Sequence, residues 1–135
     1  MKYTFIKYFL VIVVFSSCNR NINCSYLKFN EFEKITLKND RPYTGKCTSN
    51  FPGGEKESVR SYLDGKDHGN WVFFHMNGKI ATKGEMYLGK KINKWLYYYE
   101  NGEIMNIQNY DEQGNKIGNW INLEKNGDTI SILKF

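Results

Sequence analysis

A period of 24 to 25 residues runs through the second half of the chain and constrains its fold more than any other feature. A fixed period of this length indicates a repeat architecture, in which one supersecondary unit recurs and stacks on its neighbours. The single extra residue falls between Tyr110 and Gly114. The series that share the period are the dipeptides Asn77-Gly78, Asn101-Gly102 and Asn126-Gly127, the tryptophans Trp71, Trp95 and Trp120, the glycines Gly65, Gly89 and Gly114, and the residues Tyr62, Met86 and Tyr110.

Three clear units begin at the three tryptophans, and the last of them is shorter than the others. A divergent unit precedes them, in which Cys47 occupies the tryptophan position. The series predicts a repeat domain over residues 41–135 and a lead-in over residues 18–40. Within the lead-in, Ile35 to Leu37 is typical of a short strand before an Asn39-Asp40 turn, and we expect this segment to cap the first hairpin.

Each unit is predicted to be a β-hairpin. Asn-Gly between two apolar or aromatic runs favours a two-residue turn, because both turn residues then adopt positive φ. In the first such hairpin this turn pairs Phe74 with Ala81 and Trp71 with Gly84. Stacked hairpins of this kind predict an all-β fold, an elongated antiparallel array in which each unit contacts mainly its neighbours.

The predicted pairing divides the side chains between two faces of the sheet. The first face is rich in aromatic residues and carries the candidate partner-binding residues Trp71, Phe73, Trp95, Tyr97 and Tyr99. The second face is consistently apolar, so we expect it to be the core; it carries Val72, Phe74, Ala81, Leu96, Tyr98, Met105, Ile107, Ile121, Leu123, Ile130 and Ile132. Packing between neighbouring hairpins is the alternative role of the aromatic stripe, and a glycine opposite a tryptophan fits that role.

The pattern Gly-x-x-x-Gly-x-Trp, followed by an aromatic-rich run and Asn-Gly-x-Ile, resembles the variant MORN repeat of bacterial YwqK-like antitoxins. The resemblance covers about residues 41–135, and Asn93 replaces the second glycine in the middle unit. It implies a β-hairpin array that acts as an interaction surface, with antitoxin or immunity function as the family's usual label. Spacing and composition by themselves indicate no such activity.

The first eighteen residues have the pattern of a targeting segment. Lys2 and Lys7 precede an apolar run from Tyr8 to Phe15, which is shorter than the roughly 20 residues that span a bilayer. The run leads into Ser16, Ser17 and Cys18, which resemble a bacterial lipobox. The resemblance implies a signal peptide over residues 1–17 and lipid attachment at Cys18; ordinary secretion and a buried element of the fold are the alternatives.

This interpretation predicts a bacterial protein of the cell envelope, anchored to a membrane through lipid. Asn19 is not the acidic residue that retains many lipoproteins at an inner membrane, so the outer membrane is favoured. Removal of residues 1–17 leaves 17 basic against 14 acidic residues, a net charge of +3. The lysines are scattered rather than clustered, so we expect no nucleic-acid partner.

Cysteine usage agrees with an oxidising compartment. If Cys18 carries lipid, Cys24 and Cys47 remain, and they are the candidate disulfide; two free thiols are the alternative. The pair would tie the lead-in to the first repeat. No Cys-x-x-Cys spacing occurs, so we expect no metal site.

Residues able to carry catalysis are few and lie at turns or variable positions. His68 sits in a glycine-flanked connection, and His75 takes the strand position that Tyr99 holds one unit later. The pairs Glu100 with Glu103 and Asp111 with Glu112 lie at turns, where carboxylates are normally solvated. Gly53-Gly54 lacks the residues of a phosphate-binding loop. We therefore expect no enzyme and no cofactor.

These features predict a protein-binding module, either antitoxin-like or immunity-like, whose partner is a toxin or another envelope protein. The alternative is a structural scaffold of the envelope that binds glycan through the aromatic stripe. A terminal strand from Ile130 to Phe135 is a second candidate contact, because an unpaired edge accepts a partner's strand.

Overall fold

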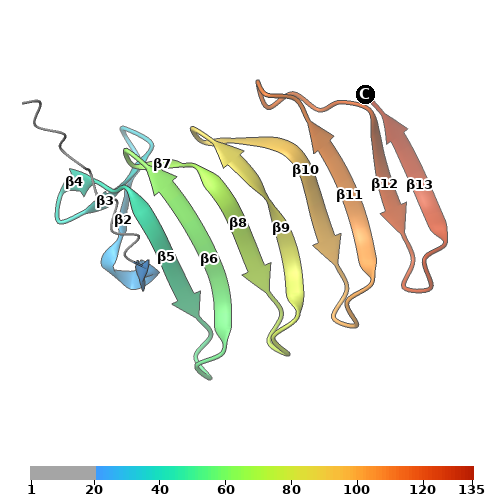
Figure 1. Ribbon diagram of the computed structural model, residues 1–135, viewed down its shortest axis with the longest axis horizontal. Helices are drawn as coiled ribbons and strands as arrows, with labels where there is room; N and C mark the ends of the chain where they lie inside the picture. Colours follow the sequence, from blue (N-terminus) through green and yellow to red (C-terminus); the bar gives the residue numbers. More distant parts are fainter. Residues whose placement is uncertain (1–20) are drawn as a thin grey trace, which may run out of the picture.

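The computed structural model describes residues 21–135, which form two β-sheets and one short 3-10 helix, η1 (Cys24–Tyr26) (Figure 1). The expected all-β array of antiparallel hairpins is confirmed. The expected signal peptide and Cys18 lie outside the described residues. Within residues 21–135, no helix has the length and apolar character needed to cross a membrane.

The large sheet has ten strands, which follow the order of the chain from one edge to the other (Figure 1). Its strands are β1 (Asn21–Asn23), β5 (Gly45–Asn50), β6 (Lys56–Leu63), β7 (Lys66–Asp67), β8 (Gly69–Phe74), β9 (Ile80–Tyr87), β10 (Lys90–Tyr98), β11 (Ile104–Tyr110), β12 (Asn119–Leu123) and β13 (Thr129–Lys134). β7 pairs with β6 beside the main row, and β1 is parallel to β5, whereas the other neighbours are antiparallel.

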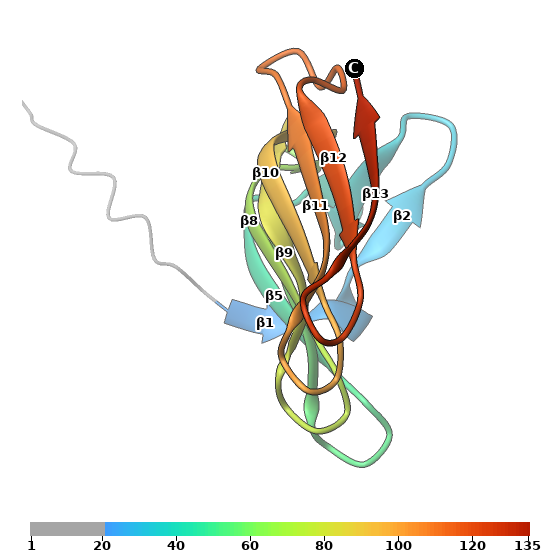
Figure 2. The ribbon, with the colours of Figure 1, turned by 90° about the vertical axis from the view of Figure 1, so that its right-hand side faces the viewer.

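A small antiparallel sheet of β2 (Lys28–Asn30), β3 (Ile35–Lys38) and β4 (Arg41–Pro42) precedes the array. Its second turn uses Asn39 and Asp40, both at positive φ, as the lead-in pattern predicts. Figure 2 shows β2 standing to one side of the large sheet. The small sheet is joined to the first repeat by backbone hydrogen bonds, among them Thr36 N–H to the Gly65 carbonyl at 2.7 Å.

The Asn-Gly turns have three residues, so the expectation of two-residue turns is wrong. In the first, His75 N–H bonds the Lys79 carbonyl and Gly78 N–H bonds the His75 carbonyl, while only Gly78 has positive φ. This is a turn with one αL glycine, and the extra residue forms a bulge. Trp71 therefore pairs with Gly84 as expected, but Phe74 pairs with Ile80 instead of Ala81.

The asparagine of each turn has a specific role that explains its recurrence. Its side-chain oxygen accepts the backbone N–H two residues later, which stabilises the turn from within. The same bond, 3.0 Å long, joins Asn77 to Lys79, Asn101 to Glu103 and Asn126 to Asp128. The recurring glycines Gly78, Gly102 and Gly127 supply the positive φ.

The opposite end of the array holds the tight two-residue turns. Asp64-Gly65 and Leu88-Gly89 have positive φ at both residues. The third connection, between β11 and β12, has a longer turn. In it, Asp111 N–H bonds the Asn115 carbonyl, and Gly114 has the positive φ. The single extra residue of the sequence is thus absorbed by converting a two-residue turn into a three-residue turn.

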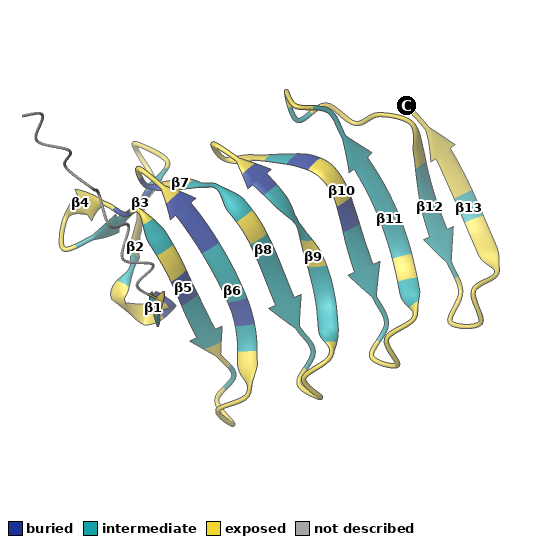
Figure 3. Ribbon diagram, viewed as in Figure 1, coloured by how far each residue is buried: buried dark blue, intermediate teal, exposed yellow. Residues whose placement is uncertain are grey.

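Most of the buried large side chains of the array lie on the aromatic-rich first face, so the expectation that the second face forms the core is wrong. We call this the aromatic face: pairing places on it Cys47, Tyr62, Trp71, Phe73, Met86, Trp95, Tyr97 and Trp120. Cys47 is fully buried, Trp95 is 3% exposed and Tyr62 is 6% exposed. Figure 3 shows the buried positions gathered on β5, β6 and β10 and at the end of β9.

The reason is that the array is a single layer. No second sheet covers either side of β8 to β13 within the described residues, so aliphatic side chains on a flat sheet stay half-exposed (Figures 1 and 2). Tryptophan, tyrosine and methionine are long enough to lie across the strands and bury one another. Whether a side chain is buried therefore depends more on its length than on the number of apolar residues on its face.

The disulfide joins the lead-in to the array. Cys24, in η1, is bonded to Cys47, on β5, with a Cα–Cα distance of 4.9 Å. The bond belongs to a cluster with Tyr43 and Tyr62, against which Ile22, Leu27 and Trp71 pack. The N-terminal segment thereby covers the β5 edge of the hairpin array, with β1 as the outermost strand.

Candidate functional site

The three tryptophans make one repeated hydrogen bond. Each indole N–H donates to a backbone carbonyl of the preceding strand: Trp71 to Ser61 at 3.0 Å, Trp95 to Glu85 at 3.1 Å and Trp120 to Asn109 at 3.0 Å. These bonds lie where the strand ladder is interrupted, for example between Ile92 and Leu96 on β10. The indole thus replaces a backbone donor and joins one hairpin to the next.

A residue in the left-handed region precedes each tryptophan by two positions. Gly69, Asn93 and Gly118 all have positive φ, between 59° and 81°. Asparagine tolerates this conformation better than other residues with a Cβ, which explains its replacement of glycine in the middle unit. The side-chain amide of Asn93 also donates to the Glu85 carboxylate at 2.8 Å.

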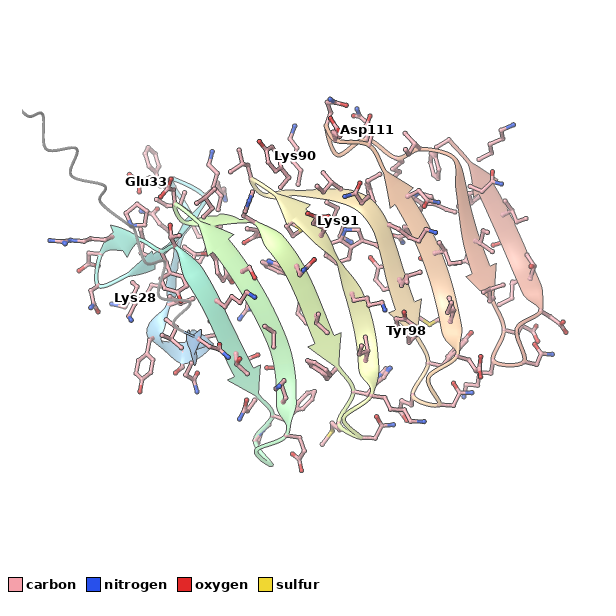
Figure 4. The ribbon with its side chains drawn as sticks, in the orientation of Figure 1. Lys28, Glu33, Lys90, Lys91, Tyr98 and Asp111 are labelled. Atoms are coloured by element: carbon pink, nitrogen blue, oxygen red, sulfur yellow. A yellow bond between two sulfur atoms is a disulfide. The ribbon has the colours of Figure 1, made fainter. Side chains whose placement is uncertain are left out.

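A cation lies over each tryptophan ring. The distances to the ring centroid are 5.7 Å for Arg60 over Trp71, 4.4 Å for Lys91 over Trp95 and 4.6 Å for Lys116 over Trp120. Lys91, which Figure 4 labels, also donates to the Tyr97 hydroxyl at 2.7 Å. Such contacts contribute about 0.5–1 kcal/mol each at exposed sites.

The structure brings together four of the five candidate partner-binding residues. Trp71, Phe73, Trp95 and Tyr97 line a shallow groove of about 310 Å³ on the aromatic face, whereas Tyr99 lies outside it. Trp95 is buried, and the other four are half-buried. Their polar atoms have partners in the chain: the Tyr97 hydroxyl donates to Gln108 at 3.1 Å, and the Tyr99 hydroxyl donates to the Leu123 carbonyl at 2.8 Å.

His75 has the same structural role as Tyr99. Its Nε2 lies 2.9 Å from the Tyr98 carbonyl of the next hairpin, as the Tyr99 hydroxyl does with Leu123 one unit later. Both side chains join the turn end of one hairpin to the following one. His68 instead packs its ring against Tyr87, with the centroids 5.4 Å apart, and its buried Nδ1 has no hydrogen-bond partner.

The candidate acid pairs lie at turns. Both oxygens of Asp111 accept hydrogen bonds from within its turn, from the N–H groups of Gln113 and Asn115 and from the Asn115 amide. Bonds from Asn115 lower the pKa of this exposed carboxyl. Glu112, Glu100 and Glu103 are exposed.

The second side of the array, which we call the aliphatic face, carries one continuous row of side chains across seven strands. Pairing aligns its members from β6 to β13 in the order Val59, Val72, Lys83, Leu96, Ile107, Ile121 and Ile132. The first six are half-buried or exposed, and Ile132 is 56% exposed. The spacing of residues in the sequence does not predict which of these side chains lie next to one another across the strands, because that alignment depends on the bulges between hairpins.

A pocket at the junction of the two sheets contains charged residues that sequence reasoning missed. This junction pocket, of about 270 Å³, lies between η1 and β2 on one side and the aromatic face on the other. Burial raises the pKa of the Asp67 carboxyl, and the positive charge of Arg60 opposes that shift. A signal was present in the sequence: Asp67 occupies the repeat position that is lysine in the two following units, at Lys91 and Lys116.

Within residues 21–135, no group of three or more histidine, cysteine, aspartate or glutamate side chains is placed to hold a metal ion. No protein-family model, no curated protein and no solved structure matches the chain.

Proposed function

We propose that the chain is a non-enzymatic, protein-binding repeat module and that the partner binds the aliphatic face. The observation that carries this proposal is the uncovered row of six aliphatic side chains and Lys83 that crosses seven strands. Contiguous apolar patches of this kind on soluble domains mark contact surfaces. A row on hydrogen-bonded strands is also rigid, so binding it costs little conformational entropy.

The aromatic face supports the proposal by contrast. Its tryptophan N–H groups and the Tyr99 hydroxyl bond neighbouring hairpins, the Tyr97 hydroxyl bonds Gln108 within its own hairpin, and its cations lie over its own rings. Recruiting these side chains to a partner would disrupt contacts that hold the array together. The aliphatic side chains make no such bonds, so they can be covered without loss.

The charges of the aliphatic face favour an acidic partner. Lys83 interrupts the row, with its ammonium 5.6 Å from the Tyr98 ring, and the neighbouring polar row includes Lys46, Lys94 and Lys134 against Glu85. A partner of matching chemistry presents an apolar strip with a carboxylate placed against Lys83. Such complementarity sets specificity and association rate more than affinity.

We further propose that this module is an envelope lipoprotein of the variant MORN-repeat type, with an antitoxin-like or immunity-like role. Supporting features are the 24-residue Gly-x-Trp to Asn-Gly pattern, the lipobox-like residues before Cys18 and a disulfide suited to an oxidising compartment. An immunity protein blocks its target by stable, stoichiometric association, so protection follows mass action.

The test is capture of partners from native envelopes by the tagged full-length chain, with quantification by mass spectrometry. Two variants alter opposite faces of the same region: Leu96→Lys/Ile107→Lys on the aliphatic face and Tyr97→Lys/Tyr99→Lys on the side of the aromatic stripe. Circular dichroism checks that each retains the fold. We expect one near-stoichiometric partner, lost with the first variant, retained with the second and weakened by Lys83→Glu.

Two results would contradict the proposal. Absence of any enriched protein would remove the protein-binding function. Loss of the partner in the aromatic-stripe variant, with retention in the aliphatic variant, would move the contact surface to the aromatic face.

A second candidate is a glycan-binding scaffold, favoured by the groove where Trp71, Phe73 and Tyr97 are half-exposed beside one another. Rings presented in this way can stack on sugar faces. Binding of purified envelope glycan that is lost in Phe73→Ala would support this function; unchanged binding would exclude the groove.

A further inference from the structure

The junction pocket holds an opposite-charge pair that the protein itself leaves unjoined. Arg60 and Asp67 line the pocket together with the exposed Lys28, yet the one ion pair found among residues 21–135 joins Lys34 to Glu31. The Nε of Arg60 is shielded from solvent and has no hydrogen-bond partner. Buried polar atoms are nearly always bonded, so the guanidinium of Arg60 lacks an acceptor that such a group usually has.

The first repeat departs from the others at this pocket. In the two later units a lysine four residues before the tryptophan covers its ring, at Lys91 and Lys116. In the first unit that position is Asp67, and the cation comes instead from Arg60 on β6. Arg60 in turn stands where the next unit has Gly84, the position over which the Trp95 ring lies. In the first unit, Asp67 therefore stands at the lysine position and Arg60 at the Gly84 position of the next unit. This is also the unit against which the small sheet closes the pocket.

The pocket has both polar and apolar walls, and its apolar side chains come from two parts of the chain. Trp71 and Tyr62 belong to the aromatic face, while Leu27 and Phe29 come from the N-terminal segment. The volume of about 270 Å³ lies just below the roughly 300–1,000 Å³ that is usual for drug-sized ligands. A small molecule with a hydrocarbon part and two charged ends fits these dimensions and this lining.

We propose that the junction pocket binds a free α-amino acid with an apolar side chain. The guanidinium of Arg60 receives the carboxylate, a group that its planar fork matches. The Asp67 carboxylate receives the ammonium group, and Trp71 and Phe29 contact the side chain. This site is separate from the aliphatic face and does not depend on the proposed function.

The test is calorimetric titration of the oxidised full-length chain at neutral pH with L-leucine, N-acetyl-L-leucine and L-leucinamide. The acetylated compound lacks the ammonium, and the amide lacks the carboxylate. We expect L-leucine to bind with a Kd of about 1 mM or tighter and each blocked compound to bind at least about tenfold more weakly, as for loss of a hydrogen bond to a charged group. This comparison uses the unaltered chain, so it does not depend on whether a variant folds.

The location is checked by the three indole N–H signals in a ¹H–¹⁵N spectrum. L-leucine should shift the Trp71 signal and leave those of Trp95 and Trp120 in place. Arg60→Gln and Asp67→Asn should each abolish binding, whereas Lys91→Gln, at the repeat position equivalent to Asp67, should retain it. No heat with L-leucine, equal binding of the two blocked compounds, or a shift confined to Trp95 or Trp120 would each overturn the proposal.

Discussion

The indole ring of Trp95 lies directly on the backbone of Gly84, the residue that Trp71 faces across the β8–β9 pair. A Cβ added at Gly84 would overlap the ring atoms Cγ, Cδ2 and Cε2. Glycine is therefore required here for close approach and not for backbone conformation. The contact spans two hairpins, because β9 closes one and β10 opens the next.

Gly84→Ala is expected to destabilise the protein by about 1–3 kcal/mol, since the indole cannot move away without losing its bond to the Glu85 carbonyl. Denaturant unfolding measures the change. Gly53→Ala is the matched control, because a Cβ there meets only the flexible end of Glu55. Equal unfolding midpoints for Gly84→Ala and the unaltered chain would show that the indole position is not fixed.

Tyr99→Phe removes the hydroxyl that bonds the Leu123 carbonyl in the next hairpin. We expect a loss of about 0.5–1.5 kcal/mol in the free energy of unfolding, the usual net value of such a bond. Tyr98→Phe serves as the control, because no hydrogen bond of the Tyr98 hydroxyl occurs within residues 21–135, and it should change stability by less than about 0.5 kcal/mol. A Tyr99→Phe variant as stable as this control would mean that the hairpin contact contributes nothing.

Asp67 makes the free energy of unfolding depend on pH. Burial raises its folded-state pKa above 3.8, so on raising the pH the unfolded chain releases this proton first. Ionisation then favours the unfolded state, and this contribution to stability falls as pH rises from 3.8 through the folded-state pKa. Asp67→Asn should therefore be more stable than the unaltered chain at about pH 7, with the difference vanishing near pH 3. Thermal unfolding at both pH values tests the sign; greater stability of the unaltered chain at pH 7 would contradict it.

Reduction of the Cys24–Cys47 disulfide opens a loop of sequence separation 23. In the chain-entropy description, closure of a loop of this size contributes about 3 kcal/mol. We expect the unfolding midpoint to fall on reduction and the N-terminal segment to become sensitive to protease before the array does. Cys24→Ser, which leaves Cys47 buried and unaltered, should reproduce the effect without reductant. An unchanged midpoint in both experiments would show that the tyrosine cluster alone holds the segment.

The architecture could be predicted from the sequence because the residues that determine it are local and repeated. The tryptophan and Asn-Gly series placed every hairpin from Trp71 onward, and the extra residue before Gly114 was located correctly. The turn type was missed, because a three-residue turn with glycine in the left-handed region has nearly the same dipeptide signature as a two-residue turn.

The core face and the junction pocket were missed for a different reason. Which face is buried depends on how rings such as Trp95 lie across neighbouring strands, and the spacing of apolar residues does not encode it. The pocket depends on Phe29 and Leu27 meeting Arg60 and Trp71, across more than thirty positions of the sequence. Its charged pair was nevertheless visible as a departure of Asp67 from the lysine of the other repeats.

The tryptophan bond between neighbouring hairpins has a consequence for the evolution of this chain. Each indole donates to a carbonyl of the strand before it, and the left-handed residue two positions before the tryptophan belongs to the same repeat junction. A block of 24 residues therefore contains the tryptophan donor that bonds it to the preceding hairpin. Duplication of one whole block would preserve the tryptophan hydrogen bond at each junction, so the array can lengthen by gene rearrangement; a junction in which the ring lies on the preceding backbone, as Trp95 lies on Gly84, also needs that glycine.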